Sequence, residues 1–213
     1  MSENTNEAEV KLTPENSEVN INIQSADAGP GGWIAYAMVT WIAWAFLVGY
    51  VNPDALLYMS CISLAATIPY LTAAATQLKL GNAAGGITWL YFGSFFAFAS
   101  AFNYFVTYFS GIHGWPLDDR ILGFMWAVLG IVLICTTPVF LKFTPSVAGI
   151  SVVAADIGIV ALALIYWGVA SPALFAISGW AFFVAGLLGM WMSIWGILDS
   201  VGIKFPMTQP LIK

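Results

Sequence analysis

The chain has 213 residues, of which 60% are hydrophobic and only 8% are charged, and its formal net charge at pH 7 is -5. Soluble domains carry about 25% charged residues, so this composition excludes a water-soluble globular domain and indicates an integral membrane protein. The acidic residues are concentrated near the start of the chain, so the net charge describes that segment rather than the body. With a single histidine, and two cysteines that lie inside apolar runs, we expect no metal site, disulfide framework or cofactor.

The first 27 residues differ in composition from the rest of the chain. They are polar and rich in Asn, Ser and Glu, with too few apolar residues to form a packed core, so we expect a disordered acidic tail over 1–27. They lack the basic and apolar regions of a signal peptide. We expect a single membrane domain over 28–200 and a short C-terminal tail over 201–213.

Six apolar segments follow, each close to the ~20 residues that a helix needs to cross a bilayer. They cover residues 33–51, 55–75, 84–109, 121–141, 148–168 and 173–198. Because backbone polar groups in lipid must be satisfied within the chain, the segments predict helices, and Pro69 is expected to break the second one internally. The fold class is therefore an all-α membrane protein with six transmembrane helices, in which consecutive helices are neighbours.

The basic residues predict how these helices are oriented. With six helices, all the lysines fall on one side, at positions 11, 79, 142, 204 and 213, whereas Arg120 falls on the other. Short cytoplasmic loops carry an excess of Lys and Arg in membrane proteins. We therefore expect a multi-pass protein of the plasma membrane with both termini in the cytoplasm.

Asp156 is the one acidic residue deep within an apolar segment. A charged side chain at the bilayer centre costs roughly 3 kcal/mol or more, so such residues face a cavity, a permeation pathway or a partner. No basic residue lies inside the segments to pair with it, and burial favours its neutral form. Two interpretations stay open: a proton-coupling or gating group in a pathway, and a protonated carboxyl that bonds to a neighbouring helix.

Other polar side chains within the segments could line such a pathway. The candidates are Thr40, Tyr70, Thr88, Ser94 and Asn103. Tyr70 is included because it follows Pro69, where a broken helix would expose backbone groups. The hydroxyl groups either line the pathway or bond to backbone and neighbouring helices. No paired carboxylates, histidine cluster or nucleophile with a base is visible, so we expect no enzyme.

The stretch KLGNAAGGITWLYFGSFF, at residues 79–96, resembles the signature K-G-N-x-x-G-x-x-x-x-x-Y-G-[SA]-F-W of the acetate/succinate transporter family (YaaH type). Residues 122–124 resemble the family's F-L-G-[FV]-Y, and residues 178–180 resemble its A-G-W. The motif before the first helix, N-P-x-P-L-G-[LM], is degenerate here: residues 27–33 keep one proline and the sixth-position glycine but lose the Asn and the first proline.

The resemblance implies six-helix protomers, each with its own pore, that assemble as homo-hexamers and pass acetate and related short monocarboxylates, with succinate in some members. Transport by an anion channel and by proton symport are both compatible with it. It also implies a pathway that narrows at three apolar or aromatic side chains, which fall on Tyr36, Phe92 and Asp156. The third departs from a leucine and puts an acid where an anion would pass. The implied partners are a small carboxylate and the lipid bilayer, and no nucleic acid.

Two other functions stay open. The urea/short-amide channel family is also six-helix and hexameric, although the K-x-G-N-x-x-G stretch at residues 79–85 argues against it. A non-transporting membrane sensor or scaffold would account for the acidic tail.

Overall fold

The computed structural model describes residues 26–212, and every regular element in that range is helical. The elements in order are α1 (Gly29–Leu47), η1 (Pro53–Ala55), α2 (Leu56–Lys79), α3 (Ala83–Tyr91), η2 (Phe92–Ala99), α4 (Ser100–His113), α5 (Arg120–Phe143), α6 (Ser146–Tyr166) and α7 (Pro172–Ser200). Most of the expected acidic tail, residues 1–25, lies outside the described residues.

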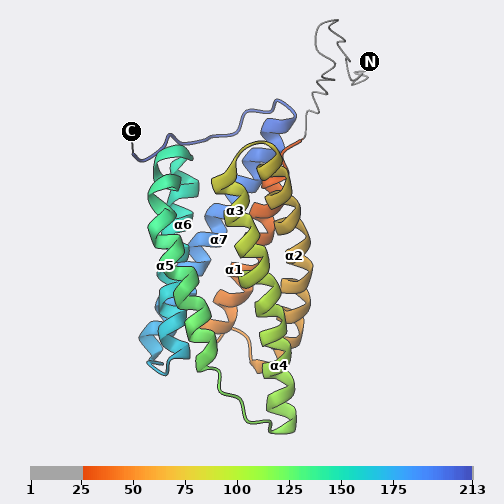
Figure 1. The fold of residues 1–213 in the computed structure, drawn as a ribbon, viewed down its shortest axis with the longest axis vertical. Coiled ribbons are helices and arrows are strands. Elements are labelled where there is room, and N and C mark those ends of the chain that lie inside the picture. Colours follow the sequence, from red (N-terminus) through yellow and green to blue (C-terminus); the bar gives the residue numbers. More distant parts are fainter. Residues whose placement is uncertain (1–25, 213) are drawn as a thin grey trace, which may run out of the picture.

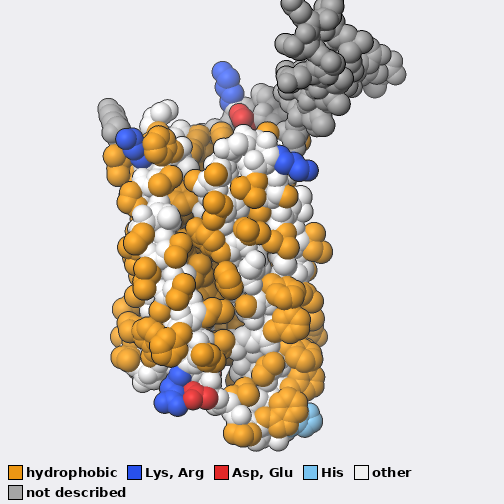
Figure 2. Space-filling model, in the orientation of Figure 1, with side chains coloured by type: hydrophobic (Ala, Val, Ile, Leu, Met, Phe, Trp, Pro, Cys, Tyr) orange, Lys and Arg blue, Asp and Glu red, His pale blue; other side chains and the backbone are white. Residues whose placement is uncertain are grey.

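Six helical stretches of the described chain are long and apolar enough to cross a membrane, as the sequence predicted. They are Gly29–Leu47, Pro53–Lys79, Ala83–His113, Arg120–Phe143, Ser146–Tyr166 and Pro172–Ser200. Figure 2 shows the Lys, Arg, Asp and Glu side chains gathered at two opposite ends of the molecule, with apolar side chains covering the band between them. The chain is therefore an all-α membrane protein with six spans.

The first span lies closer to the N-terminus than expected. It begins at Gly29 instead of residue 33, because Pro30 suits the first turn of a helix, where its missing N–H loses no hydrogen bond. It ends at Leu47 instead of residue 51, because Gly49 has a φ of 73°, which stops the helix.

The second and third spans also differ from the prediction. The expected break at Pro69 is wrong, since α2 continues through this residue to Lys79. A proline removes one backbone N–H, which a membrane helix tolerates when local adjustments and neighbouring helices compensate. The third span, expected as one α-helix, contains the π-helix η2 between α3 and α4. Such wide turns are frequent at functional sites, so η2 directs attention to the residues that it carries.

The spans form a bundle in which α1 packs between α2 and α7, and α6 packs between α5 and α7 (Figure 1). The third span packs along α2. Side chains bridge the remaining side, between the third span and the α5–α6 pair. Phe96 meets Trp126 with ring centroids 5.8 Å apart, and Asn103 Nδ2 donates to Tyr166 Oη at 3.0 Å.

Residues 203–212 fold back over the ends of α5 and α6 (Figure 1). Two amides of this segment donate to a carbonyl in the last turn of α5. In the other direction, Ser146 N donates to Gln209 O at 3.1 Å and Val147 N donates to Thr208 Oγ1 at 3.2 Å. The C-terminal segment therefore caps the first turn of α6, whose amides have no partner within the helix.

The bundle predicts that Ser110, near the end of α4, and Lys142, near the end of α5, lie on opposite sides of the membrane. We expect Ser110→Cys and Lys142→Cys, each in a chain without Cys61 and Cys135, to react with an impermeant thiol reagent from opposite faces of sealed vesicles. Labelling of both variants from one face would contradict the six-span topology.

Candidate functional site

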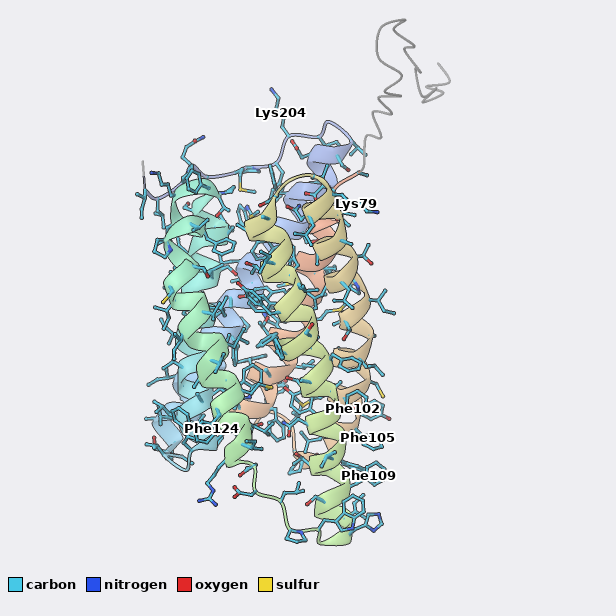
Figure 3. All side chains as sticks on the ribbon, viewed as in Figure 1. Lys79, Phe102, Phe105, Phe109, Phe124 and Lys204 are labelled. Atoms are coloured by element: carbon cyan, nitrogen blue, oxygen red, sulfur yellow. The ribbon has the colours of Figure 1, made fainter. Side chains whose placement is uncertain are left out.

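A cavity of about 580 Å³ opens at the end of the bundle where the described chain begins and ends. It lies among the first turns of α1, α3 and α6 and the last turns of α2, α5 and α7. Lys79 and Lys204 are at the same end of the molecule (Figure 3). The larger apolar side chains that line it include Trp33, Trp89, Phe140, Met192 and Trp195, and polar lining residues include Asp27, Gln77, Asn82, Thr88 and Asp199. We call this cavity the vestibule.

The inner end of the vestibule is formed by Tyr36 and Phe92, which we call the neck. These residues are 2% and 3% exposed, and their rings meet edge to face with centroids 5.4 Å apart. Phe96 lies behind them, 5.5 Å from Phe92, and contacts Trp126 and Phe182. Aromatic packing therefore closes the inner end of the vestibule.

Each ring of the neck is positioned by a neighbouring helix. Tyr36 Oη donates to Ser151 O on α6 at 3.2 Å, and the Tyr36 ring packs against Gly189 of α7. Tyr70 of α2 stacks on Phe92, with centroids 6.2 Å apart and an interplanar angle of 17°. The Tyr70 hydroxyl is buried without a hydrogen-bond partner. The neck thus joins α1 and the third span, and α2, α6 and α7 hold it in place.

Asp156 lies on the face of α6 that leads inward from the vestibule. Ala148 and Val152 line the vestibule, and residues four apart on a helix share a face, so Asp156 is the next residue on that stripe. Its side chain is 7% exposed, and it is the only Asp, Glu, Lys or Arg that is buried within residues 26–212. Thr137 Oγ1 of α5 donates to Asp156 Oδ2 at 2.6 Å, whereas Oδ1 has no partner.

The structure brings two of the three expected constriction residues into contact and places the third nearby. Tyr36 and Phe92 touch directly, and Asp156 lies on α6 one turn beyond Val152 and five residues after Ser151, whose carbonyl accepts from the Tyr36 hydroxyl. Asp156 therefore lies beside the neck, with its Oδ1 available for a further hydrogen bond.

The other candidate residues are distributed over different parts of the bundle. Thr88 lines the vestibule, although its hydroxyl donates to a carbonyl of its own helix. Thr40 is fully buried and donates to carbonyls of α1. Ser94 is half-buried on η2 and Asn103 lies farther along α4, and neither lines the vestibule. Only Thr88 and Tyr70 therefore lie at the vestibule or against the neck.

Sequence reasoning missed a polar network across the vestibule mouth. Gln77 Nε2 donates to Asp27 Oδ1, and Asn82 Nδ2 donates to Gln77 Oε1. Asp27 Oδ1 also accepts from Gly29 N at 2.8 Å, and Asn82 Oδ1 accepts from Gly85 N at 3.0 Å. An Asn directly before a helix is a capping signal that the sequence offered. Gln77 carried no such signal, because its partners Asp27 and Asn82 come close to it only once the starts of α1 and α3 have packed beside the end of α2.

The aromatic wall of the vestibule was also missed. Trp33 and Trp89 meet edge to face with centroids 5.0 Å apart, and both line the vestibule. Each lies three residues before a neck residue on the same helix, Trp33 before Tyr36 and Trp89 before Phe92. Helical spacing from the expected constriction could therefore have identified both.

The opposite end of the bundle carries an exposed ion pair. The Arg120 guanidinium donates from Nε to Asp118 Oδ1 and from Nη2 to Asp118 Oδ2, at 2.7 Å each. These hydrogen bonds hold the pKa of the Asp118 carboxyl below its ordinary value. Since both groups are exposed, we assign this pair no role in the vestibule.

The sequence and the structure were compared with those of known proteins. No family model matches the sequence, and no curated protein matches it. A solved structure, that of the bacterial acetate channel SatP, matches with a TM-score of 0.74 and 18% sequence identity, over 86% of this chain and 99% of that chain. The chain therefore has the fold of that channel over nearly the channel's whole length.

The packing of the neck makes Gly189 sensitive to substitution. A Cβ at this position would lie 2.8 Å from Tyr36 Cδ1, and Tyr36 is fixed by Ser151 and Phe92. We expect Gly189→Ala to destabilise the protein by about 1–3 kcal/mol, measured as a lower thermal unfolding midpoint in detergent. The control is Gly111→Ala on α4, where an added Cβ meets nothing within 4 Å. Equal midpoints for the two variants would contradict the tight packing of Tyr36 against α7.

Proposed function

We propose that this chain is a membrane channel or transporter for acetate and related short monocarboxylates, and not an enzyme. The observation that carries the proposal is the fold, which matches a bacterial acetate channel over 99% of that channel's length. The vestibule that ends at Tyr36 and Phe92 supports it, since an apolar constriction selects solutes by size and by the exclusion of water. The family signature at residues 79–96 supports it independently.

Selection by size is the task of the neck. Its two rings are in contact, so a solute passes only when they separate, and a small methyl group needs the least separation. Both rings belong to a larger aromatic cluster with Phe96 and Tyr70, so a wide opening would disrupt several contacts at once. Acetate is therefore the preferred substrate, and succinate, which is longer and carries a second carboxylate, is a secondary one.

Proton coupling forms a second part of the proposal. An ionised Asp156 would repel a carboxylate beside the neck, by about 4 kcal/mol for unit charges ~4 Å apart at an effective dielectric constant of 20. A neutral Asp156 would instead donate a hydrogen bond through the oxygen that has no partner. Protonation of Asp156 and passage of a carboxylate therefore favour each other, and flux falls as rising pH ionises this residue.

Assembly and orientation form the third part. The vestibule lies within the six spans of one chain, so each protomer would carry its own pathway. Phe102 and Phe105 on α4 and Phe124 on α5 are exposed apolar side chains that lipid or a neighbouring protomer can cover (Figure 3). Lys79 and Lys204 lie at the vestibule end, and by the positive-inside rule this supports our proposal that this end faces the cytoplasm.

A homo-hexamer is the expected assembly. Native mass spectrometry of the protein released from mild detergents should then show a dominant species of six chains. Monomers in every mild detergent would count against the hexamer and leave the pathway within one protomer unaffected.

Phe92→Ala tests the function and the neck together. We expect the wild-type protein to accelerate uptake of radiolabelled acetate into proteoliposomes above that of protein-free liposomes. Because the substitution removes one ring of the neck, lactate uptake relative to acetate should rise about tenfold or more. Phe105→Ala, at a 45% exposed position on α4, should leave the ratio unchanged. Absence of protein-dependent acetate uptake would contradict the function, whereas an unchanged ratio in Phe92→Ala would remove Phe92 from the neck.

A further inference from the structure

The indole N–H of Trp126 on α5 is buried without a hydrogen-bond partner. The side chain is 3% exposed, and its Nε1 bonds to no other group among residues 26–212. An indole nitrogen can only donate, and a buried donor without an acceptor is unfavourable in a protein interior. Trp126 does not line the vestibule, so its unmatched donor needs an explanation that the vestibule does not supply.

Trp126 lies behind the neck, on the side away from the vestibule. Its ring meets Phe96 edge to face with centroids 5.8 Å apart, and Phe96 meets Phe92 of the neck at 5.5 Å. The third span runs away from the vestibule, so Phe96 is farther along it than Phe92. Phe124, two residues before Trp126 on α5, lies in the half of the bundle opposite the vestibule (Figure 3). A solute that has passed the neck therefore meets Trp126 before it reaches the far end.

Trp126 lies within the apolar core of the bundle. It belongs to the same cluster of buried apolar side chains as Phe96 and Leu133. A polar pair lies farther along the third span, but there Asn103 Nδ2 already donates to Tyr166 Oη. A carboxylate in an apolar region is strongly destabilised unless hydrogen-bond donors replace its water. The Trp126 N–H is a donor in this region that no group of the described chain uses.

The chemistry of an indole N–H suits a carboxylate. The group has no acceptor, so it bonds to a carboxylate or carbonyl oxygen and offers nothing to an ammonium group. A hydrogen bond to a charged acceptor is stronger than one to a neutral acceptor, which favours the carboxylate. Because the indole is neutral, it adds no fixed positive charge that would hold the anion too tightly to leave.

We infer that Trp126 forms a carboxylate-binding site on the far side of the neck. Once the rings of the neck separate, the carboxylate accepts a hydrogen bond from Trp126 Nε1 and reaches a donor before it leaves the bundle. The site rests on the proposed function and adds a binding group to it. It is distinct from the vestibule and from the constriction at Tyr36 and Phe92, because Trp126 lines neither and contacts the neck only through Phe96.

Trp126→Phe tests the site, because it keeps an aromatic ring and removes the N–H. The full-length protein in proteoliposomes is given radiolabelled acetate well below saturation. We expect initial uptake to fall about tenfold or more, the effect of losing a hydrogen bond to a charged group. Since an indole does not ionise, the ratio of variant to wild-type uptake should be the same at each pH. Replacement of Trp126 by 3-benzothienylalanine, in which sulfur takes the place of the N–H and the bicyclic shape is kept, should give the same loss.

Trp44→Phe is the matched control. Trp44 Nε1 is also buried without a partner, but the Trp44 ring packs against Trp180, which is 53% exposed on the outside of the bundle. The same substitution there should leave acetate uptake unchanged. A second measurement separates binding from packing. If Trp126 only supported Phe96, its replacement would loosen the neck and raise lactate uptake relative to acetate, whereas we expect this ratio to stay at its wild-type value.

Three results would overturn the assignment of this site. They are wild-type acetate uptake with 3-benzothienylalanine at position 126, an equal loss of uptake in Trp44→Phe, and a raised ratio of lactate to acetate uptake in Trp126→Phe. The benzothienylalanine protein decides the question even where Trp126→Phe does not fold. Absence of protein-dependent acetate uptake by the wild-type protein would instead remove the proposed function itself.

Discussion

The close approach of α1 and α7 is the contact on which the neck depends. Apolar burial gives no advantage to helix association in lipid, so membrane helices associate where small residues let their backbones approach. On α7 a Cβ at Gly189 would lie 2.8 Å from the Tyr36 ring, and one at Gly179 would lie 2.7 Å from the Val48 side chain. Gly186 meets Thr40 and Trp41 in the same way. These glycines make room on α7 for the side chains of α1, and Tyr36 consequently points across the bundle toward Phe92.

Buried polar groups in the bundle fall into two kinds. Most donate to backbone carbonyls: the Thr40 hydroxyl within α1, and the hydroxyls of Ser151 and Ser178 across the contact between α6 and α7. A few side-chain atoms are buried without a partner, among them Asp156 Oδ1 and the Tyr70 hydroxyl. An unmatched polar atom is unfavourable in a protein interior and needs an explanation of its own. The position of these two beside the neck is explained if a solute or water supplies the missing partner during passage.

The sequence predicted the parts of this molecule that depend on composition and local pattern. The six spans follow from apolar length, and the rings of Tyr36 and Phe92, where the family resemblance implied a constriction, are in contact. Their role as a constriction stays a prediction. The role of Gln77 could not be predicted, because it bonds to residues that directly precede two other helices. The effect of Pro69 was overestimated, since the packed bundle compensates for one missing backbone hydrogen bond. The residue type alone identified Asp156 as a candidate site residue, because it is the one acid within an apolar segment. It could not identify the Thr137 hydroxyl as its hydrogen-bond donor.

The π-helix η2 bears both Phe92 and Phe96, and its wide turns have a mechanical consequence. A π-turn holds one residue more than the α-turn that could replace it. Conversion of that turn to α-geometry therefore changes the helical phase of the residues on one side of it by about 100° relative to those on the other. A local exchange of backbone hydrogen bonds would therefore turn the rings of Phe92 and Phe96 relative to the rest of the third span. The outer helices, which face lipid, need not move as rigid bodies for the aromatic closure to open.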